Sequence, residues 1–181
     1  MADLHILTPA DPADWPVWRD ARLAALADAP HAFRVRSADW HHGGEARWRA
    51  RFDRPDAVHV VAVRDDGRPV GLACGLPGPD GGDHGAGTGG DGTDERVGEL
   101  RSVWVGPAAR GQGVGDRLIA AVEEWARRAG STSLRLAVIP GNEAAVALYR
   151  RHGFAPTGAP GGLLPDGVTR ELVMAKRLRT A

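Results

Sequence analysis

The amino-acid sequence predicts a mixed α/β fold that forms one domain over residues 1–181. Short apolar runs with the two-residue alternation of strands are interspersed with segments whose apolar residues recur at helical spacing. Taken in order, these segments give the element sequence β-α-α-β-β-β-α-β-α-β-β. A chain of 181 residues is also long enough to bury roughly two thirds of the surface that it exposes when unfolded.

The N-terminal segment is predicted to form a short strand and an amphipathic helix. The strand covers residues 4–7. The helix runs from Asp14, whose carboxylate is expected to cap it, to about Ala29, before Pro30. One face of the helical wheel gathers the apolar residues Trp15, Trp18, Ala25 and Leu26. Arg22 falls in the middle of this face, and the simplest explanation is an arginine that snorkels to solvent or is paired within the fold.

A second, weaker helical region is predicted over residues 31–54, interrupted at Gly43. Three of its residues share a face, namely Gly44, Trp48 and Phe52. Arginines crowd the remaining surface, and a solvated helix face is the simplest interpretation of them. His41 and His42 are adjacent and lack the i, i+4 spacing that places two ligands on one helix face, so no metal site is predicted.

A strand pair and a polar loop come next. Residues 58–63 and 69–76 are predicted to form a hairpin that turns at residues 65–67. The following glycine- and aspartate-rich stretch, at about 78–95, has no apolar periodicity. That composition predicts a mobile loop.

The stretch from residue 97 to 154 carries the strongest pattern. A strand over residues 97–105 is predicted to place four side chains on one side, namely Glu99, Arg101, Val103 and Val105. A glycine-rich turn at residues 110–115 leads into an amphipathic helix that begins near Asp116. The core face of this helix is predicted to hold Leu118, Ile119, Val122, Trp125 and Ala126. Glu123 is expected on the outer face, paired with Arg127.

The C-terminal elements complete the predicted sheet. Residues 134–138 form a buried strand, and Asn142 caps the short helix that follows. A last strand pair is predicted at residues 154–156 and 169–177, joined by a glycine- and proline-rich loop over residues 158–167.

Composition favours a cytoplasmic protein with neither nucleic acid nor membrane as partner. The 23 basic and 23 acidic side chains balance to a formal net charge of zero. No apolar stretch reaches the roughly 20 residues of a membrane span, and Met1-Ala2-Asp3 does not open a signal peptide. Cys74 is the only cysteine, expected as a small buried hydrophobe, and it excludes an internal disulfide.

The glycine-rich turn predicts an anion site, because glycines admit close backbone approach and a helix start offers unpaired N–H groups. Two common phosphate loops are excluded by spacing. The P-loop requires Gly-Lys-Ser/Thr, and no lysine is near. The dinucleotide fingerprint counted from Gly111 requires a glycine where Asp116 stands.

The turn resembles the acetyl-CoA-binding motif of the GNAT N-acetyltransferase superfamily, Arg/Gln-x-x-Gly-x-Gly/Ala, present here as Arg110, Gly113 and Gly115. A second signature of that family resembles the segment from Asn142 to Phe154, which includes Tyr149. The resemblance implies the GNAT fold, a largely antiparallel seven-stranded sheet with helices on both faces. It also implies acetyl-CoA as co-substrate, with no metal.

The resemblance further implies which residues hold the cofactor. Main-chain groups of Val103 and Val105 would bind the acetyl oxygen and the pantetheine arm, and Asn142 would contact pantetheine amides. The pyrophosphate would lie on Arg110, Gly111, Gln112, Gly113, Val114 and Gly115.

Two catalytic residues follow from the same resemblance. Glu99 stands where many relatives carry a general base, acting directly or through water; a salt bridge with Arg101 or another arginine is the alternative. Tyr149, the only tyrosine, would protonate the departing thiolate and contact the cofactor. A core aromatic is the alternative for Tyr149.

The acceptor is expected to be a primary amine of a small molecule or peptide, acetylated by direct transfer in a ternary complex. Arg22 and Trp48 are the candidate substrate-binding residues. The sequence leaves open a longer acyl donor, a binding module that senses acyl-CoA without turnover, and a monomer or a homodimer.

Overall fold

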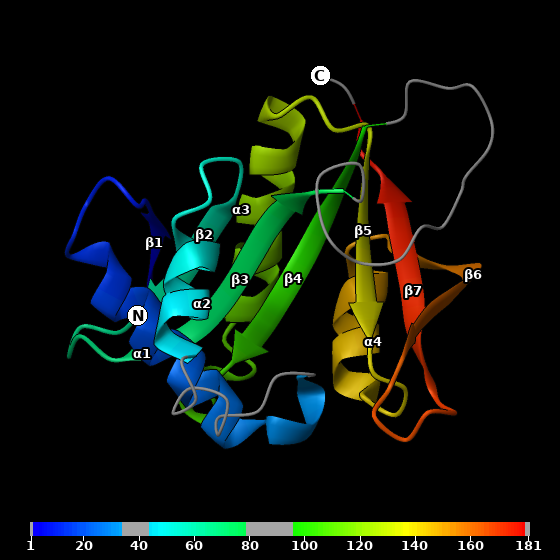
Figure 1. Cartoon of the computed structure of the whole chain (residues 1–181), viewed down its shortest axis with the longest axis horizontal. Coiled ribbons are helices and arrows are strands. Elements are labelled where there is room, and N and C mark those ends of the chain that lie inside the picture. The colour runs from blue at the N-terminus through cyan, green and yellow to red at the C-terminus, as the bar shows by residue number, and fades with distance from the viewer. Residues whose placement is uncertain (1, 34–43, 79–95, 180–181) are drawn as a thin grey trace.

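The computed structural model describes residues 2–33, 44–78 and 96–179 (Figure 1). Seven strands form one sheet in the order β1-β2-β3-β4-β5-β7-β6. Their bounds are β1 Asp3–Leu7, β2 Val58–Val63, β3 Pro69–Pro77, β4 Val97–Val105, β5 Ser133–Val138, β6 Ala155–Leu163 and β7 Arg170–Arg177. Neighbouring strands are antiparallel except β4 and β5, which are parallel. The predicted mixed α/β fold with a largely antiparallel seven-stranded sheet is confirmed.

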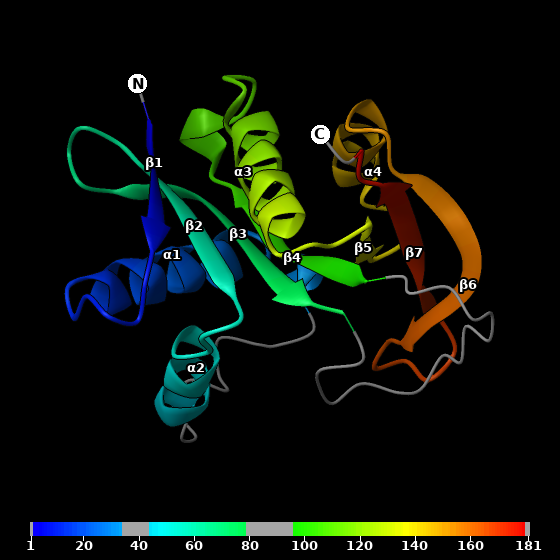
Figure 2. The ribbon, with the colours of Figure 1, turned by 90° about the horizontal axis from the view of Figure 1, so that it is seen from above.

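Helices cover both faces of this sheet, as predicted. On one face lie α1 (Asp14–Asp28) and α2 (Gly44–Phe52), and on the other lie α3 (Val114–Arg128) and α4 (Glu143–Arg151) (Figure 2). Two short 3₁₀ turns, η1 (Pro30–Ala32) and η4 (Pro107–Ala109), follow α1 and β4. No helix in the described ranges is long and apolar enough to cross a membrane.

Each face of the sheet carries its own core. The α1/α2 core buries the predicted apolar faces, including Trp15, Trp18, Leu26, Trp48 and Phe52. The α3/α4 core is built largely from aliphatic residues, such as Leu118, Ile119, Val122 and Leu134, and it includes Tyr149 and Phe154. Removing these side chains from water is the main stabilising contribution on both faces.

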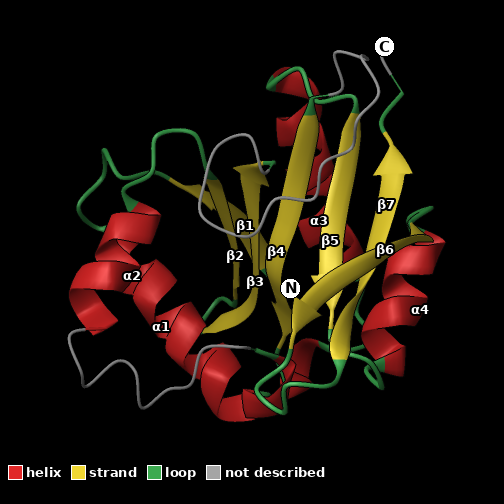
Figure 3. Ribbon diagram, turned by 45° about the vertical axis from the view of Figure 1, so that its right-hand side comes forward, coloured by secondary structure: helices red, strands yellow, loops and turns green. Residues whose placement is uncertain are grey.

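β4 and β5 separate along their length. They pair only where Val97, Gly98 and Glu99 lie beside Ser133, Leu134 and Arg135. Beyond this point the strands diverge, so that they form a V with its narrow end at the start of both strands (Figures 1 and 3). The opening exposes main-chain groups of β4 that a neighbouring strand would otherwise bind.

A β-bulge at Ser102 overturns the predicted side-chain alternation of β4. The register with β3 shifts between Leu72 and Cys74, and Ser102 adopts a φ of 56°, which is rare for a residue other than glycine. The extra residue reverses the faces: Glu99 and Arg101 point to the α1/α2 side, while Val103 and Val105 pack on the α3/α4 core. The four side chains therefore do not share one side.

One predicted helix cap and one predicted side-chain placement are also wrong. Asp14 does not cap α1: its Oδ2 atom instead accepts a hydrogen bond from the backbone N–H of Thr8, at 2.8 Å. Glu123 does not lie on the outer face of α3. It is buried, and although it pairs with Arg127 as predicted, it also accepts a hydrogen bond from Lys176 at 2.6 Å.

The segments rich in glycine and proline depart furthest from the prediction. Most of the predicted loop 158–167 is strand, because β6 continues to Leu163. Its sparse pairing with β7, interrupted by two register shifts, explains how prolines are accommodated there. Within the predicted second helical region, the structure describes α2 over Gly44–Phe52. Residues 34–43 and 79–95, including most of the predicted mobile loop, lie outside the described residues.

Candidate active site

The start of α3 forms an open glycine turn beside β4. Gly111 and Gly113 both have a φ of 73°, a conformation that glycine adopts without strain. A Cβ atom at either position would meet nothing within 4 Å, so the space above the turn is open. Gly113 precedes the helix and offers no side-chain cap, which leaves the N–H groups of the first turn for an external acceptor. An anion is the ligand that this arrangement suits.

Gly115 has a different role from the two glycines before it. A Cβ atom there would lie 3.0 Å from Leu148 of α4 and 3.5 Å from Val105 of β4. The glycine therefore permits close packing where α3, α4 and β4 meet. Val114, next to it, is buried in the α3/α4 core.

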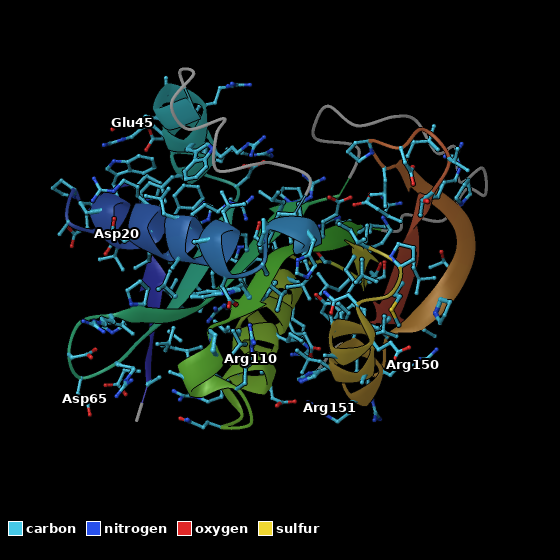
Figure 4. All side chains as sticks on the ribbon, turned by 90° about the horizontal axis from the view of Figure 1, so that it is seen from below. Asp20, Glu45, Asp65, Arg110, Arg150 and Arg151 are labelled. Carbon is cyan, nitrogen blue, oxygen red and sulfur yellow. The ribbon has the colours of Figure 1, made fainter. Side chains whose placement is uncertain are left out.

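Arg110 is tied to α1. Its Nε donates to the carbonyl of Val105 at 3.1 Å, and its Nη2 donates to Oδ2 of Asp28. Asp28 also accepts a hydrogen bond from Nε1 of Trp104, at 3.0 Å. In Figure 4 Arg110 lies between α1 and the first turn of α3. A phosphate bound by the Arg110 side chain would thus compete with Asp28, a partner that no local sequence signal predicts.

Gln112 likewise makes an internal contact. Its side-chain Nε2 donates to the carbonyl oxygen of Ala108 at 2.9 Å, which fixes the turn against η4. The contribution of Gln112 to an anion site would therefore come from its main chain.

Two predicted residues stand on α4. Asn142 caps the helix as predicted, because its Oδ1 accepts a hydrogen bond from the N–H of Ala145 at 3.2 Å. Tyr149 is 7% exposed, and its ring packs edge-on against Phe154. Burial raises the pKa of the Tyr149 phenol above its ordinary value. The phenol is therefore protonated at neutral pH, as a proton donor must be.

A cleft of about 520 Å³ lies at the wide end of the V. His31 and Ala32 of η1 line one side, and residues 139–144, which form the β5–α4 link and the start of α4, line the other. Asn142 belongs to this lining, so the cap of α4 is also a wall of the cleft.

Glu99 is held by two guanidinium groups near the narrow end of the V. Arg101 donates from Nε to one carboxylate oxygen at 2.7 Å, and Arg135 donates from Nη2 to the other at 3.0 Å. The side chain of Glu99 is 12% exposed. The salt-bridge alternative is thus present in the structure. A base role requires an amine or a water to share these oxygens with the two arginines.

The two candidate acceptor-binding residues have different surroundings. Trp48 is 2% exposed and packs edge-on against Trp18, which favours a packing role. Arg22 is buried as well, but its charge is directed at β4, where Nη1 donates to Oγ of Ser102 at 3.0 Å.

A polar network joins α3 to α4, and sequence reasoning missed it. His152 Nε2 lies 3.1 Å from Asp116, and Arg151 donates to the same carboxylate at 3.3 Å. Figure 4 shows Arg151 on the side of α4 that faces α3, with Arg150 directed away. Desolvation acts to raise the pKa of the Asp116 carboxylate, but the hydrogen bonds with His152 and Arg151 outweigh it, so that this pKa is lowered. The network fixes the relative placement of the helices that carry the glycine turn and Tyr149.

Comparison with known proteins establishes the class. The profile of the Acetyltransferase (GNAT) family matches residues 19–154, so the chain belongs to this family. The resemblance drawn from Arg110, Gly113 and Gly115 is confirmed, and the chain carries an acetyltransferase domain of this family. Among the described residues, no group of three or more histidines, cysteines or carboxylates could hold a metal ion.

Individual relatives have diverse names. The IAA acetyltransferase of Azospirillum brasilense is 38% identical over 86 residues, which are 48% of this chain and 55% of that protein. The mycothiol acetyltransferase of Jonesia denitrificans is 33% identical over 138 residues, which are 76% of this chain and 40% of that protein. The chain thus spans about half the length of these curated relatives, or less.

A solved structure covers the whole fold. The ribosomal-protein-alanine N-acetyltransferase of Brucella melitensis superposes with a TM-score of 0.63 at 29% identity. The match covers 97% of this chain and 99% of that one.

Proposed function

We propose that the protein transfers an acetyl group from acetyl-CoA to a primary amine of a small molecule or peptide, directly and within a ternary complex. The observation that carries this proposal is the meeting of α3, α4 and β4 at Gly115, which brings together an open glycine turn, a diverging strand pair and the helix of the buried Tyr149. Together they supply a phosphate site, a slot for an extended chain and a proton donor.

The chain's own groups suit the parts of acetyl-CoA. The first-turn N–H groups of α3, with residues 111–115, suit a pyrophosphate. Main-chain groups of Val103 and Val105, left unpaired by β5, suit the acetyl oxygen and the amides of the pantetheine arm. Asn142 would contact the same arm from the other side of the V.

Two side chains are proposed to move protons. The buried and protonated phenol of Tyr149 would protonate the thiolate as it leaves. Glu99 would accept a proton from the acceptor amine, directly or through a water, while Arg101 and Arg135 hold its carboxylate in place.

Cys74 supports direct transfer over an acyl-enzyme route. It is the only cysteine of the chain, and it is buried beside His59, whose Nδ1 lies 3.2 Å from its Sγ. Burial raises the pKa of the Cys74 thiol to about 11, so the nucleophilic thiolate is scarce at neutral pH.

The identity of the acceptor cannot be taken from the relatives, because their names point to different acceptors. The test is a thiol-release assay with acetyl-CoA and a panel of amines: amino acids, peptides, polyamines and cationic antibiotics. Varying both substrates should give intersecting reciprocal plots, as a ternary complex requires. Parallel plots would contradict direct transfer, and no thiol release with any amine would contradict the proposed activity.

A further inference from the structure

Asp28, the last residue of α1, binds the arginine that leads into the glycine turn. Its Oδ2 atom accepts a hydrogen bond from Nη2 of Arg110 and another, at 3.0 Å, from Nε1 of Trp104 in β4. One carboxylate oxygen thus joins α1, β4 and the turn before α3. The Asp28 side chain is 22% exposed and the Arg110 side chain is 57% exposed. The ion pair can therefore be reached from solvent.

The guanidinium of Arg110 lies beside the groups proposed to hold the cofactor. Arg110 directly precedes Gly111, and its Nε donates to the carbonyl of Val105 at 3.1 Å. Val105 ends β4, beyond the residues that pair with β5. The space above Gly111 and Gly113 is open. In this structure the Nε and Nη2 donors of Arg110 are thus directed at internal acceptors next to an open turn.

Asp28 and a phosphate are rivals for this guanidinium. Both are anions that accept hydrogen bonds from the same kind of donor, and they repel each other when both are close to it. An ion pair as exposed as this one contributes about 1 kcal/mol or less, so a phosphate can displace it. Trp104 would still donate to Asp28 after Arg110 has left, so the released carboxylate keeps a partner.

Asp28 also stands next to one wall of the cleft. Ala29 alone separates α1 from η1, whose His31 and Ala32 line the cleft. The N–H of Ala32 donates back to the carbonyl of Ala29 at 3.0 Å, which makes this connection compact. The contact that holds Asp28 therefore also bears on the position of the η1 wall.

We propose that Asp28 is a positioning residue that competes with the cofactor phosphate for Arg110 and thereby links the glycine turn to the η1 wall. This inference rests on the proposed function, because it takes residues 110–115 as the phosphate site. In the free protein the ion pair ties the wall to the turn. When a pyrophosphate binds, the guanidinium turns to it, Asp28 keeps Trp104 as its donor, and the tie is released.

The affinity test removes the charge of Asp28 and keeps an acceptor oxygen. Asp28→Asn still offers a carbonyl to Trp104 but no longer attracts the guanidinium as an anion. The dissociation constant of acetyl-CoA, measured by calorimetry, should fall by about 2- to 5-fold, the range expected when a partly exposed ion pair no longer competes. A purely structural role predicts the opposite sign, because a loosened turn binds phosphate less well. Unchanged or weaker binding by folded Asp28→Asn would overturn the inference.

Two controls isolate the competition. Asp56→Asn removes another carboxylate that pairs with an arginine, Arg54 at 2.7 Å, and changes the net charge equally, so acetyl-CoA affinity should not change. Arg110→Met removes the cation for which the two anions compete. In that background Asp28→Asn should no longer tighten binding. Equal tightening with and without Arg110 would show that Asp28 only repels the cofactor, against the proposal.

The indole N–H of Trp104 reports the release of Asp28 without turnover. The chain has six tryptophans, and Trp104→Phe identifies this resonance in a nitrogen–hydrogen correlation spectrum. Saturating inorganic pyrophosphate, which has no pantetheine arm to enter the cleft, should shift the Trp104 signal and the ring signals of His31 in the wild type. Both should stay nearly in place in Asp28→Asn, where Arg110 is already released.

The same spectra separate this inference from the proposed function. Shifts of Trp104 and His31 with pyrophosphate and CoA, in a protein that releases no thiol with any amine, would support the inference and contradict the proposed activity. Thiol release by a protein whose Trp104 signal does not move at saturating pyrophosphate or CoA would overturn the inference alone.

Discussion

In the part of the chain that the structure describes, each face of the sheet buries one charged residue, and the surroundings of the two differ. Glu123, on the α3/α4 side, and Arg22, on the α1/α2 side, are both 6% exposed. Glu123 has two cationic partners, Lys176 at 2.6 Å and Arg127 at 3.2 Å. Among the described residues, Arg22 has a serine hydroxyl and an aromatic ring. Similar burial therefore coexists with very different electrostatic compensation.

This difference matches the proposed division of the molecule into a cofactor-binding half and an acceptor-binding half. Glu123, which Lys176 and Arg127 pair, belongs to the half of the molecule proposed to hold the cofactor. Arg22 belongs to the half proposed to meet the acceptor, and the names of the relatives point to different acceptors.

The largest expected effect tests the cofactor half. Gly113→Asp places a side chain at a φ of 73° and a negative charge at the helix start, where a phosphate would bind. The affinity for acetyl-CoA should fall by about 100-fold or more, equal to roughly 2.7 kcal/mol, and activity with it. Acetyl-CoA should then no longer raise the melting temperature.

Gly67→Asp is the control for backbone strain alone. Gly67 has a φ of 82° in the β2–β3 turn, far along the chain from the glycine turn. This variant should lose some stability but keep the acetyl-CoA shift. If folded Gly113→Asp also keeps the shift, α3 does not hold the pyrophosphate.

The next largest effect tests the chemistry on the same half. Tyr149→Phe keeps the ring and its contact with Phe154 but removes the proton donor. kcat should fall by about 10- to 1,000-fold. The loss is expected to be smaller than the full contribution of a general acid, because a thiolate leaves fairly well unaided. The acetyl-CoA shift should stay the same. Full activity in the folded variant would make Tyr149 a core residue only.

The sequence predicts the α3/α4 half of the molecule better than the α1/α2 half. The core face over residues 118–126 is predicted correctly because its apolar residues recur at helical spacing, and the cap at Asn142 is predicted correctly because capping is a local interaction. Family spacing located the glycine turn. The exception is Glu123, whose partner Lys176 lies 53 residues away in sequence, beyond any local pattern.

The acceptor half was predicted less well because its decisive features are not local. The bulge at Ser102 depends on the register between β3 and β4, which no two-residue alternation reveals. Asp28 meets Arg110 across 82 residues. Arg22 was noticed as a charge on an apolar face, but its hydroxyl partner on β4 became visible only in three dimensions.

A smaller effect is expected where the two halves meet. Glu99→Gln should lower activity by about 10-fold at pH 7 and by less as the pH rises, because more of the acceptor amine is then already neutral. The pH profile of kcat/KM measures this recovery. Arg101→Met is the matched control, since it breaks the ion pair but keeps the carboxylate. If both variants lose stability alike and keep the wild-type profile, Glu99 serves only as a salt bridge.

The last effect is on stability alone and concerns His59, a buried polar residue of the α1/α2 half that is not assigned to the site. Burial lowers the pKa of His59 from its ordinary value of 6.5 to about 4. Between these two values the unfolded chain binds more protons than the folded one, so stability falls as the pH falls through this window. His59 should therefore lower the free energy of unfolding by about 2 kcal/mol between pH 7 and pH 5. His59→Phe keeps a ring beside Phe52 and should remove that part of the pH dependence in urea unfolding, whereas exposed His5→Gln should leave it unchanged. An identical slope in His59→Phe and the wild type would show that His59 takes up its proton without unfolding. The α1/α2 half would then tolerate a second buried cation, which would weaken the contrast with Glu123.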